Sequence, residues 1–193
     1  MPDPIPLHEP RPLRSICVFC GSSPGDDPAY TAAAESVAEA LVARGVRVVY
    51  GGAHVGLMGA VADTALAAGG QVVWVIPRSM VDREVAHRGL TELHVVGSMH
   101  ERKALMADLS DGFVALPGGM GTLEELTEVL SWAQLGLHHK PVALLDVDGY
   151  WDAWLAFLDR AVAAGFLRPE HRGLLLSGND VDGVLDAMAR WRG

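Results

Sequence analysis

The sequence predicts an α/β protein built on one doubly wound parallel sheet, and three features of the chain support this. Short apolar runs rich in β-branched residues alternate with longer, alanine-rich stretches of helical character. The apolar runs are hydrophobic at consecutive positions, which is typical of strands buried on both faces of a parallel sheet. Glycine-rich segments follow several of these runs and precede predicted helices. Strands and helices that alternate in this way give a sheet covered by helices on both faces.

The predicted elements follow one another from Ser15 to the end of the chain. Strands are expected at 15–20, 46–52, 71–77, 93–97, 112–119 and 141–146. Helices are expected at 28–45, 56–70, 99–110, 122–137, 149–167 and 180–192. This order predicts a single Rossmann-like domain over residues 14–193. Residues 1–13 hold five of the eleven prolines, and we expect them to form a flexible, partly extended arm.

Composition and charge limit the classes of function. The chain has 193 residues, half of them apolar, and a formal net charge of −9. These values fit one globular domain and argue against a protein that wraps nucleic acid. No apolar run approaches the roughly 18 residues of a membrane span, and the N-terminus lacks the apolar core of a secretory signal. We therefore expect a cytoplasmic protein with no membrane or nucleic-acid partner.

The two cysteines, Cys17 and Cys20, lie three residues apart in the first predicted strand. Residues at this spacing point to opposite faces of a strand. We therefore expect two buried, reduced thiols and not a redox pair or a metal clip. The histidines also lack a pair at helical spacing with a carboxylate, so no metal site is expected.

Glycines gather where the predicted strands end, which is where such sheets bind ligands. The segments concerned contain Gly21 and Ser22, Gly51 and Gly52, and Gly118, Gly119 and Gly121. Glycine allows a ligand to approach the main chain, and the N-terminus of a following helix suits a phosphate. Neither glycine loop has the GxGxxG or Walker A sequence, and tight turns or helix packing would explain either loop alone. The two loops together favour a nucleotide-phosphate pocket.

Two pairs of charged residues could act at this edge of the sheet. Glu124 and Glu125 follow Thr122 at the start of a predicted helix. Thr122 and Glu125 have the spacing of a capping box, so Glu125 could be a purely structural cap. Alternatively, one of the two carboxylates faces the pocket and acts on a water or on a cationic transition state. Arg102 and Lys103 begin another helix, either as a surface pair or as a binding site for a phosphate or carboxylate.

At this point the motifs resemble those of a known family. The sequence PGGMGTLEE at 117–125 resembles the PGGxGTxxE signature of the LOG ("Lonely Guy") family, phosphoribohydrolases that are often mislabelled lysine decarboxylases. The resemblance extends over residues 15–165 and includes VFCGSS, YGGAHVGLMG, VIPRSM and GSMHERKALM. The PGGxGT motif alone is also similar to molybdenum-cofactor carriers and to other nucleotide nucleosidases. Its combination with MHERK and GGxxGLMG at these spacings is specific.

The resemblance implies a homodimer that hydrolyses the N-glycosidic bond of a nucleoside 5′-monophosphate without a cofactor. The products would be ribose 5-phosphate and a free base, typically a cytokinin such as isopentenyladenine. Carried over by motif, Arg102 and Glu125 would be catalytic, with Glu124 beside them. The substrate would contact Glu84, Lys103, Gly118, Gly119, Met120, Gly121 and Thr122, together with the glycine-loop residues Gly21, Ser22, Gly51 and Gly52. Plant members often have an aromatic residue where this chain has Met120, which leaves the preferred base open.

Other functions stay open from the sequence. A general purine or pyrimidine monophosphate nucleosidase would share the chemistry and differ in its pocket for the base. A non-enzymatic carrier of a phosphorylated cofactor would retain its ligand without turnover, but the Arg102–Lys103 pair and the double glutamate favour an enzyme. A pyridoxal-phosphate decarboxylase would need Lys103 or Lys140, and neither lies in a recognisable motif for that cofactor.

Overall fold

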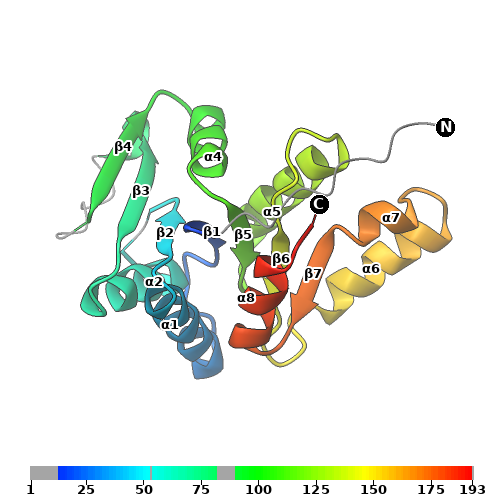
Figure 1. Ribbon diagram of the computed structural model, residues 1–193, viewed down its shortest axis with the longest axis horizontal. Coiled ribbons are helices and arrows are strands. Elements are labelled where there is room, and N and C mark those ends of the chain that lie inside the picture. Colours follow the sequence, from blue (N-terminus) through cyan, green and yellow to red (C-terminus); the bar gives the residue numbers. More distant parts are fainter. Residues whose placement is uncertain (1–12, 53, 82–89, 193) are drawn as a thin grey trace.

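The computed structural model describes residues 13–52, 54–81 and 90–192, and it contains one parallel sheet of seven strands (Figure 1). The strands are β1 Ser15–Phe19, β2 Arg47–Tyr50, β3 Val72–Pro77, β4 Glu92–Val96, β5 Gly112–Ala115, β6 Val142–Leu145 and β7 Leu175–Gly178. Their order across the sheet is β4-β3-β2-β1-β5-β6-β7, and each neighbouring pair is parallel. All six predicted strands are present, and β7 is one that the sequence analysis missed.

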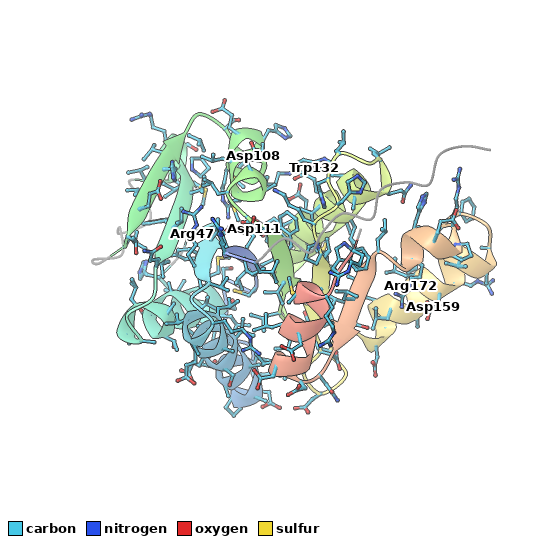
Figure 2. The ribbon with its side chains drawn as sticks, in the orientation of Figure 1. Arg47, Asp108, Asp111, Trp132, Asp159 and Arg172 are labelled. Carbon is cyan, nitrogen blue, oxygen red and sulfur yellow. The ribbon has the colours of Figure 1, made fainter. Side chains whose placement is uncertain are left out.

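Helices cover both faces of the sheet, which confirms the doubly wound architecture. They are α1 Pro28–Ala43, α2 Gly56–Ala67, α3 Arg78–Val81, α4 Met99–Asp108, α5 Met120–Gln134, α6 Asp152–Ala163, α7 Pro169–Arg172 and α8 Val181–Ala189. Buried residues of α1, α2 and α8 form one apolar core with the sheet, and those of α4 and α5 form a second core on the opposite face. The short helix α7 is tied to α6 by an ion pair of Arg172 with Asp159 at 2.9 Å (Figure 2).

The central strand β1 contributes side chains to both apolar cores, one on each face of the sheet. All five of its residues are buried, and successive side chains enter opposite cores. Cys17 lies in the core beneath α4 and α5, whereas Cys20, just past the strand, lies in the core beneath α1 and α2. Both thiols are free and buried, as the strand periodicity predicts. No helix within the described residues is long and apolar enough to cross a membrane.

The strand order places a switch point beside β1. The chain first builds outward through β2, β3 and β4, and then returns to the other side of β1 to form β5. The loops that leave β1 and β5 therefore lead to helices on opposite faces of the sheet, and the switch point between two such strands is where sheets of this kind bind ligands. The predicted site segments lie here, because 21–23, 51–59 and 117–122 follow β1, β2 and β5.

Candidate active site

Three loops meet at the carboxyl edge of the sheet and are joined through Gly21. The N–H of Gly21 donates to the carbonyl of Pro117 at 3.0 Å, which ties the β1–α1 loop to the β5–α5 loop. The carbonyl of Gly21 accepts from the N–H groups of Leu57 and Met58 at 3.1 and 3.3 Å, which ties the same loop to the start of α2. Ser22 is exposed, and its backbone packs against Gly56. The sequence analysis was right that these segments converge.

The β2–α2 loop is filled by protein atoms. A methyl group at Gly51 would overlap the Arg102 guanidinium, and one at Gly52 would overlap the Trp74 indole. A methyl group at Gly56 would overlap the backbone of Ser22, and Gly56 also has a positive φ of 64°. These glycines therefore make room for the protein's own groups, which is the packing role that the sequence left open for either loop.

The β5–α5 loop is open by comparison. Helix α5 begins at Met120 with Gly119 as its N-cap, so no cap side chain covers the first N–H groups. Space around Gly119 and Gly121 is free for at least 4 Å in the direction of a side chain, and Met120 is 81 % exposed. Gly118 is different, because a methyl group there would overlap Thr122, and its carbonyl accepts the Tyr150 hydroxyl at 2.6 Å.

The capping-box interpretation of Glu125 is wrong. Gly119 and not Thr122 is the N-cap, and Thr122 lies buried within the first turn of α5. The carboxylate of Glu125 instead faces α4, where its Oε1 lies 3.3 Å from Nη2 of Arg102. The helix starts three residues earlier than a Thr122 cap would require because glycine is itself accepted at the N-cap.

Arg102 and Glu125 form a buried ion pair, with 7 % and 9 % of each residue exposed. The Nη1 group of Arg102 lies 3.7 Å from the sulfur of Met99, and its Nε has no hydrogen-bond partner among the described residues. Burial raises the pKa of Glu125 above its ordinary value, against the lowering effect of Arg102. The pair therefore combines a proton-accepting carboxylate with a guanidinium that has donors to spare.

Lys103 and Glu124 form a second ion pair beside the first. Lys103 is buried, and its Nζ donates to Glu124 and, at 3.0 Å, to Glu128. The Glu124 side chain is 56 % exposed, so of the two adjacent glutamates it is Glu125 that points inward. Sequence analysis missed Glu128, although its position four residues after Glu124 places both on one face of α5. Glu84, the remaining predicted site residue, lies outside the described residues.

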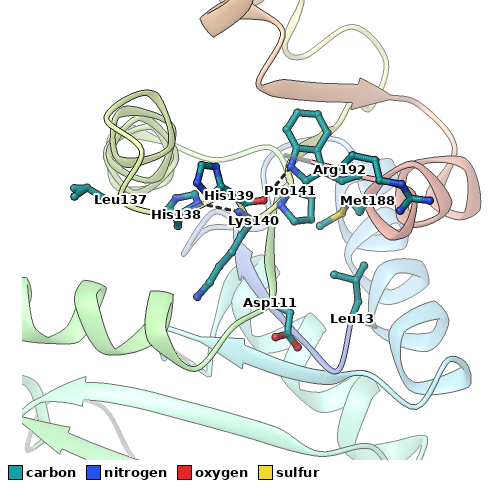
Figure 3. A pocket seen from close by; sticks show the side chains of 10 residues that line it. Leu13, Asp111, Leu137, His138, His139, Lys140, Pro141, Met188 and Arg192 are labelled. Carbon is teal, nitrogen blue, oxygen red and sulfur yellow. Dashed lines mark hydrogen bonds between the residues drawn. The ribbon is translucent and has the colours of Figure 1, made fainter. Parts of the chain in front are cut away.

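A separate cavity of about 300 Å³ lies at the opposite edge of the sheet (Figure 3). It is lined by residues that precede β1, β5 and β6, among them Leu13, Asp111 and Lys140. Its polar groups bond within the protein: the Lys140 ammonium donates to the carbonyl of Ala107 at 2.7 Å, and the Trp191 indole donates to the carbonyl of His139 at 3.0 Å. This cavity is therefore not part of the predicted site. Within the described part of the chain, no group of three or more His, Cys, Asp or Glu side chains is placed to hold a metal ion.

The fold defines a Rossmann-like α/β protein, and its candidate site lies at the carboxyl edge of the sheet, where such folds bind small molecules. Residues 58–188 match a family described as "Possible lysine decarboxylase". A rice (Oryza sativa subsp. japonica) protein named "Probable cytokinin riboside 5'-monophosphate phosphoribohydrolase LOGL9" is 52 % identical over 96 % of this chain and 81 % of its own length. A Rhodococcoides fascians protein named "Cytokinin riboside 5'-monophosphate phosphoribohydrolase" is 47 % identical over 97 % of this chain and 96 % of its own length. The chain belongs to this family, which confirms the resemblance to LOG proteins.

Solved structures show the same fold at much lower identity. The molybdenum-cofactor carrier protein of Chlamydomonas reinhardtii has a TM-score of 0.67 and 23 % identity, and covers 90 % of this chain and 93 % of its own. The molybdenum cofactor binding protein of Rippkaea orientalis has a TM-score of 0.66 and 20 % identity, with the same coverage. At these identities the likeness describes the architecture alone.

Proposed function

We propose that the protein hydrolyses the N-glycosidic bond of cytokinin riboside 5′-monophosphates and releases the free base and ribose 5-phosphate. Relatives at 47–52 % identity, matched over 81 % and 96 % of their own length, carry the name of this activity. The observation that carries the proposal is the buried Arg102–Glu125 pair beside the open start of α5. This arrangement offers a carboxylate for a cationic sugar and, on the same helix, an N-terminus without a side-chain cap for a phosphate.

The proposed chemistry is that of a glycosidase acting on a ribosyl–base bond. As the bond from the anomeric carbon to the base nitrogen breaks, its electron pair leaves with the base and positive charge develops on the sugar. The carboxylate of Glu125 would stabilise that charge and accept a proton from the attacking water. Water supplies the new hydroxyl of ribose 5-phosphate. The departing base takes up a proton from the medium, and Glu125 returns to the medium the proton that it accepted from the water. Arg102 would use its free donors to orient the sugar hydroxyls or the leaving base.

The 5′-phosphate would lie at the N-terminus of α5. The N–H groups of Met120 and Gly121 begin this helix, and the glycines leave space for a ligand to approach them. The positive end of the helix dipole favours a phosphate over the neutral hydroxyl of a riboside. A preference for nucleoside monophosphates over nucleosides follows from this placement.

We also propose that the protein acts in the cytoplasm as a homodimer. The support is the family resemblance, together with exposed apolar side chains at the end of α5, where Leu135 and Leu137 are both 69 % exposed. Light scattering coupled to size-exclusion chromatography measures the mass directly. A single species at 20.5 kDa would contradict the dimer.

A chromatographic assay tests the function. Purified protein is incubated with AMP and with isopentenyladenosine 5′-monophosphate, each beside its dephosphorylated riboside. Release of base from the monophosphates alone would support the phosphoribohydrolase, and faster release from the isopentenyl substrate would support cytokinin activation. Equal rates would point to nucleotide salvage, and no release from folded protein would overturn the proposed activity.

A further inference from the structure

Five charged side chains form one cluster between α4 and α5. Arg102 and Lys103 project from α4, and Glu124, Glu125 and Glu128 project from α5. Neighbouring residues on a helix are rotated by about 100° from each other. The side chains of Arg102 and Lys103 therefore leave α4 in different directions and meet different residues of α5. Arg102 meets Glu125, while Lys103 meets Glu124 and Glu128, which share a face one turn apart.

We propose that Lys103 is a positioning residue of the proposed active site, which Glu124 and Glu128 hold against α5 so that Arg102 faces Glu125. The inference rests on the proposed function and differs from the substrate contact that the family resemblance implies for Lys103. Two of the three N–H bonds of its ammonium point to these carboxylates. Lys103 is as buried as Arg102, and a substrate group that bound its ammonium would compete with these two carboxylates for it.

The position of Arg102 depends on this second pair. A methyl group at Gly51 would overlap the Arg102 guanidinium, and among the described residues the ionic partner of Arg102 is Glu125, at 3.3 Å. Lys103 adds two contacts between the same helices at the next residue along α4. The doubly anchored lysine therefore restricts sliding or rotation of α4, which would draw the guanidinium away from the carboxylate.

Lys103 also sets the electrostatic environment of Glu125. On α5, Glu124 and Glu128 both raise the pKa of Glu125, whereas on α4 Arg102 and Lys103 lower it. Burial and then Glu125 raise the pKa of the Cys17 thiol on β1, and the same two causes raise the pKa of Cys20, which follows the strand in the core on the other face of the sheet. Without Lys103, Glu124 and Glu128 would remain beside Glu125, and Arg102 would be the one cation of the described part of the cluster to offset them.

The two roles of Lys103 make opposite predictions for Glu128. If Lys103 binds the substrate phosphate, Glu128→Gln frees a donor for the phosphate and lowers KM. If Lys103 is a positioning residue, Glu128→Gln removes one of its anchors, so kcat falls and KM stays the same. The substitution also removes a charge that raises the pKa of Glu125, so the acidic limb of the rate profile moves to lower pH.

The experiment measures kcat and KM from pH 4.5 to 8.5 for wild type, Lys103→Met, Lys103→Arg and Glu128→Gln. The substrate is the nucleoside 5′-monophosphate that wild type hydrolyses fastest. Lys103→Met should lower kcat about 10- to 100-fold, leave KM within about twofold, and move the acidic limb up by about one pH unit. Lys103→Arg keeps the positive charge, so the acidic limb of its pH–kcat profile should lie at the same pH as in wild type. A raised KM with unchanged kcat in Lys103→Met, or a lowered KM in Glu128→Gln, would overturn the proposal.

A second measurement separates this proposal from the proposed function. Carboxyl-carbon NMR follows the ionisation of Glu125 in wild type and Glu128→Gln without any substrate. A lower Glu125 midpoint in Glu128→Gln supports the cluster even if wild type hydrolyses nothing, and an unchanged midpoint overturns it. Circular dichroism establishes that each variant is folded, and if Lys103→Met does not fold, Lys103→Arg and Glu128→Gln still decide between the two roles.

Discussion

Helices α2 and α5 both begin in glycine-rich loops at the carboxyl edge of the sheet, yet their N-termini are in opposite states. The start of α2 is closed, because the carbonyl of Gly21 accepts from Leu57 and Met58 and because the loop glycines fit against protein atoms. The start of α5 is open, with a glycine N-cap and free space at Gly119 and Gly121. Similar composition therefore serves packing in one loop and leaves room for a ligand in the other.

A glycine motif in a sequence predicts a close approach to the backbone but does not identify the group that approaches. Glycine is required wherever something lies close to the backbone, and the sequence does not reveal whether that neighbour is a side chain or a substrate. Here the β2–α2 loop accommodates the Arg102 guanidinium and the Trp74 indole. The same loop thus contributes to the site indirectly, by admitting the guanidinium that faces Glu125.

The largest effect is expected at Glu125, the inward carboxylate of the open helix. Glu125→Gln keeps the shape and removes the charge, so kcat for base release should fall about 10²- to 10⁴-fold with little change in KM. Glu124→Gln is the comparison variant, because the same change is made one residue away on a side chain that is 56 % exposed; only the smaller loss that follows from a weakened anchor of Lys103 is expected there. Equal losses in the two variants, measured by chromatography, would contradict the assignment of Glu125 as the inward group.

The next largest effect is on stability, at the closed helix. Gly56→Ala places a side chain in a left-handed conformation and against the backbone of Ser22, so the free energy of unfolding should fall by about 2–4 kcal/mol. Urea denaturation measures the loss. Gly45→Ala separates the two causes, since Gly45 has a φ of 69° and no atom within 4 Å of an added methyl group. If both variants lose the same stability, the contact with Ser22 costs nothing.

Gly121→Ala makes the same change at the open start of α5, and here we expect no loss in the free energy of unfolding. Apart from its chain neighbours and the backbone of its own helix, no described atom lies within 4 Å of the added methyl group, so stability should stay the same or rise by up to about 1 kcal/mol. The methyl group would narrow the approach to the helix N-terminus, and KM for a nucleoside 5′-monophosphate should rise about tenfold. An unchanged KM in steady-state assays would place the phosphate elsewhere.

The smallest effect lies beyond the far end of α5, at His138. The Nε2 group of His138 donates to the carbonyl of Val129 at 2.9 Å, and its Nδ1 accepts from the N–H of Lys140 at 3.2 Å, so the ring is neutral. Burial lowers its pKa, so the unfolded chain takes up a proton near pH 6.5 while the folded protein does not. Stability from this residue is therefore present above pH 6.5 and is lost as the pH falls below it.

Thermal denaturation between pH 8 and pH 5 measures this loss. His138→Gln should reduce the pH-dependent change in the free energy of unfolding by up to about 1 kcal/mol relative to wild type. The comparison with wild type cancels the contributions of the other seven histidines. Identical slopes in the two proteins would contradict a neutral, buried His138.

Most of the fold follows from the sequence, because local patterns determine it. Strand β3 is apolar at every position and β1 is apolar at every position after Ser15, and each is followed by a helix, so this pattern and order specify a parallel sheet. Strand β7 was missed because its four residues, two of them Ser177 and Gly178, form too short and too polar a run between helices. The single domain and the flexibility of residues 1–13 stay predictions.

The site was predictable in its location and less so in its pairings. Motif position alone brings the three loops to one edge, since parallel strands end together there. The contact of Arg102 with Glu125 depends on how α4 lies against α5, and no local pattern encodes that packing. The predicted cap at Thr122 was wrong for the same reason, because the local spacing fits a capping box while the packing turns Glu125 toward Arg102.

The fit of Arg102 against Gly51 has an evolutionary consequence. Any side chain at position 51 would take the space of the guanidinium, so the two positions are expected to change together and not singly. Substitution of Gly51 should harm a protein that keeps Arg102 and be far better tolerated in one that has already lost it. Glycine at position 51 is therefore expected to be conserved as long as Arg102 is conserved, and a homologue with a larger residue at 51 is expected to lack this arrangement of the site.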